Sequence, residues 1–491
     1  MQLYMWKPEE RIRYQPIDCQ WPTQEQAANS PVFQTIAIGP IRLAQKTWIP
    51  AMVPWRSNVA GEVTEDVIQW YERYAQGQPG AIVIEATGIR DVPSGPLLRI
   101  SHDRYIDGLS ELVKRVKAAS NNQTKVLIQI IDFLAIKRRP NRDAFLTRFL
   151  KITPQHIAKL NAPDLSEEEL RQRLIALPDD ELKDVLNQRE YSQLSHGYRE
   201  YVTDLDLPHI AELPAVLPDL FASAASRAAK AGFDGIELHY AHAYTMASFL
   251  SAKNNRTDGY GGSREARIKL PIEVFNSVRK AVGPEVAVGC RFLTNECIDS
   301  GSDLEDACYY AVEFAKAGMD FLSLSRGGKF DDAKQPKVGA AAYPYTGPSG
   351  YECMPGHISD EFGPFGRNIE PTNAVRAAVV AAGYTTPVVC AGGIHNFEQA
   401  EQLLIENQAD IVGMARQAMA DPDWFRKVKS GNGNQVKLCE YTNYCEGLDQ
   451  KHKQVTCQLW DREKLDEPNI RMSHDGKRRL VAPTWNPETK S

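Results

Sequence analysis

Eight short apolar runs recur along the chain, and each is separated from the next by a longer segment with other periodicity. The runs are continuous rather than alternating, which is typical of parallel strands covered on both faces. Eight even strand–helix units indicate a closed (β/α)₈ barrel, because doubly wound sheets rarely contain so many. The predicted strands are 46–52, 81–87, 125–132, 235–241, 286–292, 321–325, 387–393 and 410–416.

Amphipathic patterns fill the intervals between these runs and predict the helices of the barrel. A helical face is marked by Leu109, Val113 and Val116 after the second strand. The other predicted helices are 65–75, 217–231, 266–282, 303–317, 373–382, 397–406 and 422–428.

Four segments lie outside this repeat. Residues 1–31 are polar and predict an arm on the surface of a barrel domain that spans 32–430. Two insertions, about 135–214 and 330–367, follow predicted strand ends, where long connections often shape a pocket or a lid. Ser166 and Glu169 form a capping-box pattern that predicts a helix within the first insertion. Residues 431–491 form a C-terminal extension.

The composition and charge of the chain argue against nucleic-acid binding, membrane insertion and secretion. The 491 residues are 43% apolar, which allows a full-sized core, and the net charge of −6 provides no basic footprint for nucleic acid or anionic lipid. No apolar run has the length of a membrane span, and the N-terminus lacks a signal-peptide core. Nine scattered cysteines suit a reducing compartment. We therefore expect a soluble, cytoplasmic protein that acts on a small molecule.

Chemistry in such a barrel lies at the C-terminal ends of the strands. His239, His242 and Tyr244 follow one another at the end of the fourth predicted strand. Imidazoles can donate hydrogen bonds to an oxygen atom, and a phenol can also deliver a proton. The alternative is that the two histidines are ordinary satisfied core residues.

Small residues follow the last two predicted strands. Gly392 and Gly393 end the seventh strand, and Ala415 and Arg416 end the eighth. Small residues let backbone N–H groups approach a phosphate, and an Arg adds a charged fork, so this pattern predicts a phosphate site. A simple tight turn is the alternative for the two glycines.

The longest distinctive block, 231–244, continues through 249–251, 255–258 and 260–263. With 85–87, 391–394, 410–416 and 420–422, it resembles the old yellow enzyme family of FMN-dependent oxidoreductases. The similarity is to the branch that contains trimethylamine dehydrogenase and 2,4-dienoyl-CoA reductase, and it covers roughly residues 32–457. The resemblance implies a TIM-type barrel with FMN across its mouth.

The resemblance also implies a role for each matching residue. His239 and His242 would hold the electron-withdrawing oxygen of the substrate, and Tyr244 would protonate carbon. The implied FMN-binding residues are Met52 and Ala86 along the flavin ring, Gln129 at its pyrimidine edge, Arg291 near N1 and O2, and Gly392, Gly393, Ala415 and Arg416 at the phosphate.

The chain departs from the family pattern at several positions. Val53 follows Met52 where the family has a small polar residue that tunes the flavin. Asp132 follows Gln129 on the third strand, and we expect it to contact a cationic or hydroxyl-bearing substrate, with a structural cap or salt bridge as the alternative. Tyr345, in the second insertion, is a further candidate substrate contact; packing of that loop on itself is the alternative.

The C-terminal extension departs most from the family. Larger members bind an iron–sulfur cluster through four cysteines. Here the motif holds only Cys439, Cys445 and Cys457, and Thr442 stands in the place of the second cysteine. Such clusters normally need four thiolates, so we expect a degenerate motif without metal. The alternative is an incomplete cluster, or one completed by Glu440 or His452.

Three functions follow from the resemblance. The first is NAD(P)H-dependent reduction of an activated C=C bond, and His239 favours it because the amine branch tends to have Tyr there. The second is oxidative demethylation or dehydrogenation of an amine. The third is an electron-transfer subunit that depends on a separate donor protein. No dinucleotide-binding glycine motif occurs in the chain, so we expect electrons from NAD(P)H at the mouth or from a partner. The family also implies a homo-oligomer.

Overall fold

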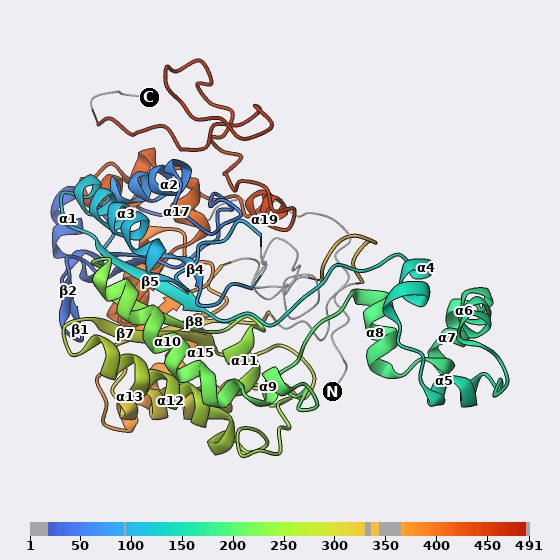
Figure 1. Cartoon of the computed structure of the whole chain (residues 1–491). Coiled ribbons are helices and arrows are strands. Elements are labelled where there is room, and N and C mark those ends of the chain that lie inside the picture. The colour runs from blue at the N-terminus through green and yellow to red at the C-terminus, as the bar shows by residue number, and fades with distance from the viewer. Residues whose placement is uncertain (1–17, 93–94, 329–334, 343–364, 488–491) are drawn as a thin grey trace.

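The centre of the molecule is a closed barrel of eight parallel strands (Figure 1). The computed structural model describes residues 18–92, 95–328, 335–342 and 365–487. Around the ring the strands run in the order β10-β3-β4-β5-β6-β7-β8-β9, which confirms the predicted (β/α)₈ fold. The strands are β3 (Thr47–Ile49), β4 (Ala81–Gly88), β5 (Lys125–Ile131), β6 (Gly235–Tyr240), β7 (Ala287–Leu293), β8 (Leu322–Ser325), β9 (Val388–Ala391) and β10 (Ile411–Gly413).

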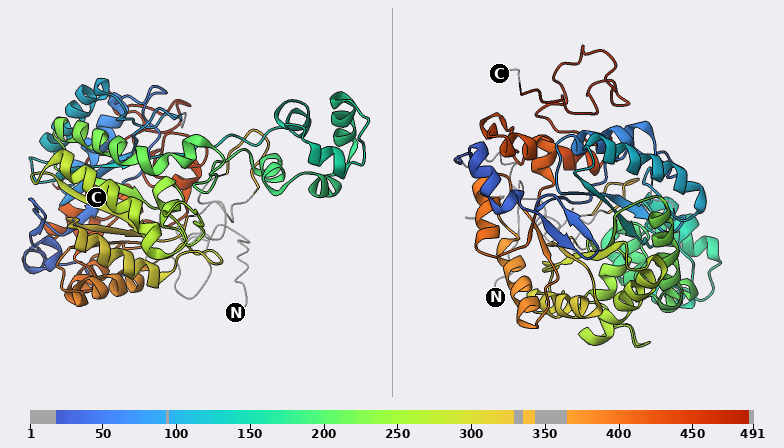
Figure 2. Two further views of the ribbon diagram at one scale, coloured as in Figure 1. Left: turned by 60° about the horizontal axis from the view of Figure 1, so that its bottom comes forward. Right: turned by 90° about the vertical axis from the view of Figure 1, so that its left-hand side faces the viewer.

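Helices surround the strands on all sides, as the right-hand view of Figure 2 shows. Each turns an apolar face to the sheet; α2, for example, begins after the N-cap Thr64 and buries Val67, Trp70 and Tyr71. The main barrel helices are α2 (Glu65–Ala75), α3 (Ile106–Ala119), α10 (Leu213–Lys230), α12 (Arg264–Val282), α13 (Leu304–Ala317), α15 (Ile369–Ala381), α16 (Phe397–Ile405) and α18 (Trp424–Lys429). Shorter helices are α1 (Gln24–Asn29), α9 (Pro208–Ala211), α11 (Thr245–Leu250), α17 (Arg416–Ala420) and α19 (Tyr444–Asp449).

The predicted strands 46–52 and 410–416 are much longer than the observed β3 and β10. β3 ends at Ile49 because Pro50 has no N–H to donate to a neighbouring strand, so Met52 lies in irregular chain beyond the strand. β10 ends at Gly413, and Arg416 opens α17 instead of closing the strand. Both changes leave the affected residues at the C-terminal end of the barrel.

The opposite, N-terminal end of the barrel is closed by a hairpin. β1 (Ile36–Ile38) and β2 (Ile41–Leu43) pair antiparallel, and Ile38 and Leu43 pack on the interior side chains Trp48 and Phe321. These four side chains are fully buried. The C-terminal end therefore remains as the open end.

The first insertion folds as a helical unit with its own core, which includes Phe145, Leu170 and Leu182. The predicted capping box is present, since Ser166 accepts from the backbone of Glu169 and Glu169 accepts in return. The unit stands away from the barrel in both figures, so its helices do not cover the mouth. Its elements are α4 (Arg142–Ala144), a π-helix (Phe145–Phe149), α5 (Pro154–Lys159), α6 (Glu167–Ala176), α7 (Asp179–Val185) and α8 (Gln188–His196).

The C-terminal extension packs against the barrel beside the segment that follows β3. Arg56 donates to the backbone oxygens of Val455 and Leu480, at 2.8 and 2.5 Å, and its guanidinium lies 4.3 Å from the ring of Trp70. These contacts hold α19 at the rim of the barrel (Figure 1). Among the helices described, none is both long enough and apolar enough to cross a membrane.

Candidate active site

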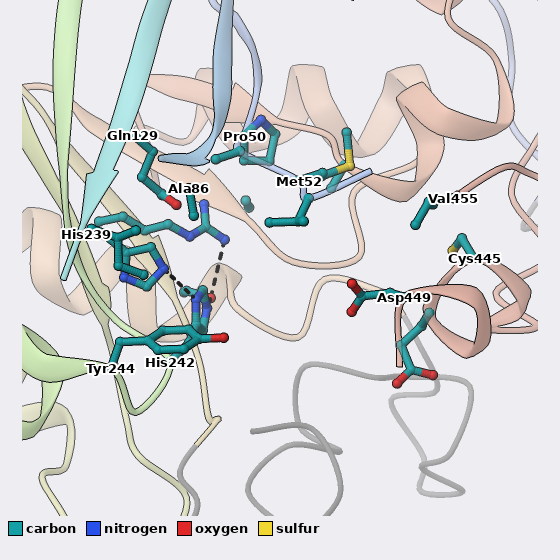
Figure 3. A pocket seen from close by; sticks show the side chains of 18 of the residues that line it. Pro50, Met52, Ala86, Gln129, His239, His242, Tyr244, Cys445, Asp449 and Val455 are labelled. Atoms are coloured by element: carbon teal, nitrogen blue, oxygen red, sulfur yellow. Dashed lines mark hydrogen bonds between the residues drawn. The ribbon is translucent and has the colours of Figure 1, made fainter. Parts of the chain in front are cut away.

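A cavity of about 570 Å³ opens at the C-terminal ends of the strands. Its size falls in the range typical of small-molecule and cofactor sites. Figure 3 shows His239, His242 and Tyr244 on one side of it, and Cys445, Asp449 and Val455, from the C-terminal extension, on the other. The cavity brings together nearly all the predicted site residues: Met52, Ala86, Gln129, His239, His242, Tyr244, Arg291, Gly392, Gly393, Ala415 and Arg416.

The strand register explains why side chains from distant positions meet here. His239 on β6 lies beside Arg291 on β7, which lies beside Ser323 on β8. Ser325 follows two residues later on the same face of β8. Neighbouring positions in parallel strands point to the same side, so these groups share the interior of the barrel.

The chain turns sharply after β6. His242 and Ala243 have φ values of 58° and 65°, in the left-handed region that residues with a Cβ seldom adopt. Consecutive strained residues of this kind often mark functional sites, because the surrounding fold must hold them in place. The turn directs His242 back toward His239 and leaves Tyr244 as the residue before α11.

Hydrogen bonds define the tautomers of the two histidines. The backbone N–H of Ala241 donates to His239 Nδ1 at 3.4 Å, so His239 carries its proton on Nε2. Nε2 then donates to His242 Nδ1 at 3.4 Å, and His242 Nε2 donates to Ser325 Oγ at 2.7 Å. Arg291 Nη2 also donates to Ser325 Oγ, at 3.3 Å. The result is a row of N–H donors along one wall of the cavity.

Burial sets the charge state of this wall. It lowers the pKa of His239 to about 3, and the positive charge of Arg291 acts in the same direction. The pKa of His242 is well below its ordinary value for the same two reasons, with a further contribution from His239. Burial, followed by the charge of Asp449, raises the pKa of Tyr244. At neutral pH the site thus offers two neutral imidazoles and a protonated phenol.

The rings of these three residues are also packed together. The His239 ring lies 5.3 Å from that of His242 and 5.4 Å from that of Tyr244, both edge-on. Phe133 supports Tyr244 from the far side, with an edge-on centroid distance of 5.2 Å. Edge-on aromatic contacts restrict ring rotation, so the phenol is held in position before any ligand arrives.

The end of the cavity near β9 is lined by Gly392 and Gly393. Gly392 has φ 152°, and a Cβ there would lie only 2.6 Å from the Cβ of Asn368. Asn368 is anchored by its bonds to Thr294 Oγ1 and the Ala391 carbonyl, at 2.9 and 3.1 Å. Arg416 donates to Asn443 Oδ1 at 3.1 Å and lies over the ring of Tyr441.

The donor set fits FMN. The cavity combines a narrow glycine-rich end suited to phosphate, apolar surface at Met52 and Ala86, and polar groups at Gln129 and Arg291. Gly392 is required there because a Cβ would clash with Asn368, and its backbone therefore lines this end of the cavity without a side chain. These residues would hold the phosphate at one end and the ring system beside the histidine wall.

The structure places Asp132 in a salt bridge, the alternative named above, and not on the cavity wall. Its side chain is fully buried and does not line the cavity. Arg90 donates to both carboxylate oxygens, at 2.5 and 2.9 Å. Burial raises the pKa of Asp132, while the charge of Arg90 opposes that change. Asp132 therefore joins β5 to the end of β4 as a structural ion pair. Tyr345, the other predicted substrate contact, lies outside the described residues.

Replacing Arg90 with alanine is expected to destabilise the protein by about 3 kcal/mol, because Asp132 would be left buried without its partner. Equilibrium urea unfolding measures this change. Lys316→Ala is the control: its ion pair with Glu313 is exposed and should contribute less than about 1 kcal/mol. Equal effects of the two substitutions would contradict the structural role of Arg90.

The wall opposite the histidines was not found by sequence analysis. It comes from the C-terminal extension and includes Cys445, Glu446, Asp449 and His452. Trp55 Nε1 donates to Asp449 Oδ1 at 2.5 Å, and the ring of Trp55 stacks on His452 at 4.1 Å. Nearly 400 residues separate Trp55 from Asp449, and no local pattern signals such a contact.

Burial raises the pKa of Asp449 to about 6, so the folded protein binds a proton more tightly than the unfolded chain does. Ionisation therefore costs stability as pH rises from about 4 to 6, and the full cost remains above pH 6. Asp449→Asn stays neutral and keeps an acceptor for Trp55. We expect it to stabilise the flavin-free protein by about 1–3 kcal/mol at pH 8 and hardly at all at pH 4. Urea unfolding at both pH values tests this; the same gain at both would contradict it.

Burial favours the protonated thiol form of the three cysteines in the extension. Burial raises the pKa of Cys445 to about 12, and it raises those of Cys439 and Cys457 as well. Cys439 Sγ accepts from the backbone N–H of Tyr441 at 3.4 Å. Within the part of the chain that is described, no group of three His, Cys, Asp or Glu side chains is arranged to hold a metal ion.

Comparison with known proteins identifies relatives of this barrel. Residues 215–435 match the model of the NADH:flavin oxidoreductase / NADH oxidase family. The chain is 27% identical over 413 residues to an NADH oxidase of Thermoanaerobacter brockii, covering 83% of this chain and 52% of that protein. It is 24% identical over 460 residues to an N,N-dimethylglycine/sarcosine dehydrogenase of Chromohalobacter salexigens, covering 92% and 56%. The chain thus spans about half the length of these two relatives.

Solved structures agree on the fold. A complex of 2-naphthoyl-CoA reductase with 2-naphthoyl-CoA superposes with a TM-score of 0.64 at 18% identity, covering 90% of this chain and 59% of that one. At this identity the similarity concerns the architecture. The family match over residues 215–435 confirms the resemblance inferred from the block 231–263.

Proposed function

We propose that this chain binds FMN and reduces an activated C=C bond with electrons from NAD(P)H. The match of residues 215–435 to the NADH:flavin oxidoreductase / NADH oxidase family supports this proposal. The observation that carries the proposal is the convergence of His239, His242 and Tyr244 beside Arg291 in one cavity. FMN, when bound, supplies the hydride in this chemistry.

The histidine wall would hold the electron-withdrawing oxygen of the substrate. In the resting arrangement His239 Nε2–H points at His242, and His242 Nε2–H points at Ser325. A substrate oxygen entering between them would replace these acceptors. Neutral imidazoles suit this task, since they stabilise developing negative charge without giving up a proton.

Tyr244 would deliver the proton to carbon. Its raised pKa keeps the phenol protonated throughout the neutral range, and its ring is held by Phe133 and His239. Burial of this wall excludes water, which makes a positioned phenol the proton source next to the reacting carbon.

Oxidation of an amine is the second candidate. Asp132 no longer supports it, but Glu446 and Asp449 place two carboxyl groups on the cavity wall, where an ammonium group could approach. One relative is named N,N-dimethylglycine/sarcosine dehydrogenase. His239 still favours the reductase, because a histidine N–H is suited to an oxygen acceptor.

Stopped-flow absorbance of the flavin-loaded protein tests these functions together. Bleaching of the flavin by NADPH or NADH, followed by recovery on adding cyclohexenone, is expected for the reductase. Bleaching by dimethylglycine or trimethylamine instead would favour amine oxidation. Failure of both would point to a separate electron-donor protein, and a chain that takes up no FMN would overturn the proposal.

Iron analysis of the same preparation tests the C-terminal motif. We propose that Cys439, Cys445 and Cys457 hold no cluster. The expected result is flavin absorbance without iron or acid-labile sulfide. Iron near three or four atoms per chain in anaerobically purified protein would contradict the degenerate motif.

A further inference from the structure

A buried acid lies beneath the candidate flavin site. Glu237 sits on β6, two residues before His239, and has no solvent exposure. It pairs in register with Gln129 on β5, and Gln129 Nε2 donates to Glu237 Oε1 at 2.6 Å. The other oxygen, Oε2, is buried and no hydrogen bond of ordinary geometry reaches it, although the Ser323 hydroxyl also interacts with this carboxyl group. A buried carboxyl that is only half satisfied is costly, so a purpose beyond packing is expected.

The first consequence concerns the orientation of the Gln129 amide. An ionised carboxyl group only accepts hydrogen bonds, so the amide nitrogen of Gln129 must face Glu237. The amide oxygen then faces the cavity, as Figure 3 shows. Without a carboxylate below it, the amide could turn over and present nitrogen instead. Glu237 thereby decides whether the floor of the cavity offers an acceptor or a donor.

The second consequence concerns charge. Arg291 lines the cavity one interior layer above Glu237, beside His239 on the neighbouring strand. Burial raises the pKa of Glu237, while the positive charge of Arg291 is the largest influence that opposes this rise. The interaction is mutual: ionised Glu237 offsets part of the positive charge that Arg291 presents to the cavity.

We propose that Glu237 is a positioning residue for the flavin. Its carboxylate turns the Gln129 oxygen toward the pyrimidine edge of the flavin and moderates the positive charge that Arg291 presents to the cavity. The proposal rests on the proposed binding of FMN. It assigns Glu237 an influence on both the affinity for flavin and its midpoint potential, although the side chain does not line the cavity.

Glu85 provides a matched control. It is as completely buried as Glu237, and no hydrogen bond of ordinary geometry reaches its carboxylate oxygens, although the Tyr71 hydroxyl interacts with this carboxyl group. It lies on β4, where its backbone N–H donates to the Tyr71 hydroxyl of α2, and it does not line the cavity. Glu85→Gln therefore tests what the loss of a buried carboxyl does without any contact to Gln129.

The experiment compares Glu237→Gln and Glu85→Gln with the parent protein. FMN affinity is measured by fluorescence titration of the apoprotein, and midpoint potential by equilibration with reference dyes. For Glu237→Gln we expect about tenfold weaker FMN binding, as for one lost hydrogen bond to a fixed partner. We also expect a more positive midpoint potential, because Arg291 is less compensated. Glu85→Gln should change neither quantity.

A double variant separates the two effects. In a Gln129→Ala background, Glu237→Gln should no longer weaken FMN binding, because the amide that it orients is absent. The positive shift in potential should persist, since it acts through Arg291. The effects of the two substitutions on FMN affinity should therefore be non-additive, while their effects on the midpoint potential should be additive. A general loss of packing would not produce this combination.

An unchanged affinity and potential in Glu237→Gln would overturn the proposal, as would equal changes in Glu85→Gln. Parent protein that binds no FMN would instead overturn the proposed function, so the two failures are distinguishable. Should Glu237→Gln fail to fold, judged by thermal melting of the apoprotein, Glu237→Asp keeps the charge and shortens the reach. That variant should retain the parent potential and lose affinity; a shift in its potential would contradict the charge argument.

Discussion

Tyr244→Phe is expected to lower the rate of alkene reduction by about 10²–10⁴-fold, the usual contribution of a positioned proton donor. Flavin reduction by NADPH should be unchanged, because no proton from this phenol is needed in that step. Single-turnover stopped flow measures the two steps separately. The ring and its contacts with Phe133 and His239 are kept in the variant, so the loss reports the hydroxyl alone.

Tyr240→Phe is the matched control. Tyr240 is the last residue of β6, before the turn that leads to Tyr244, but its hydroxyl donates to the Pro271 carbonyl in the helix layer, at 2.9 Å, away from the cavity. That substitution should alter stability and leave the rate of reoxidation by alkene unchanged. Retention of the full reoxidation rate in Tyr244→Phe would show that another group or water supplies the proton.

The second large effect is expected at His242. His242→Ala removes a donor from the wall that holds the substrate oxygen, and loss of one such donor costs about 10²–10³ in rate. The steady-state rate with enone and its KM measure the loss. His102→Ala is the control, because His102 is 59% exposed and pairs with Asp91 at the surface. Equal effects of both substitutions would contradict the oxyanion role.

The lowered histidine pKa values also predict how the protein responds to pH. A histidine whose pKa is lower in the folded state makes its full contribution to stability when the pH is above its unfolded-state pKa, near 6.5. That contribution is lost as the pH falls toward the folded-state pKa. For His239 the window runs from about 6.5 down to about 3. We therefore expect stability to decline below pH 6.5, while the reoxidation rate shows no histidine titration between pH 6.5 and 8. A rate change centred near 6.5 that His242→Ala abolishes would contradict this.

The residues that sequence analysis brought together correctly share one property. His239 and Arg291 each stand near the C-terminal end of a recognisable strand. Parallel strands in a closed barrel end on the same side, so the strand pattern alone predicts that these side chains meet. The register then places them as neighbours, and the prediction needed no knowledge of loops.

Asp132 shows where this reasoning stops. It also stands at a strand end, one residue beyond β5, and by the same rule it should face the mouth. The distinction depends on Arg90, which arrives from the end of β4 and draws the carboxylate into a buried pair. The choice between a ligand contact and an ion pair is made by a neighbour some forty residues away, and no spacing in the sequence records it.

The sequence by itself determined the barrel, the end that carries the site, and the histidine and tyrosine groups at that end, because these follow from periodicity within each strand and from the common direction of all eight. The tertiary structure decided which polar groups face the cavity: Asp449 faces it, Asp132 is withdrawn, and Glu237 lies below. The reason is that a buried charge takes the partner that packing places beside it, and those partners, Trp55, Arg90 and Gln129, come from remote parts of the chain.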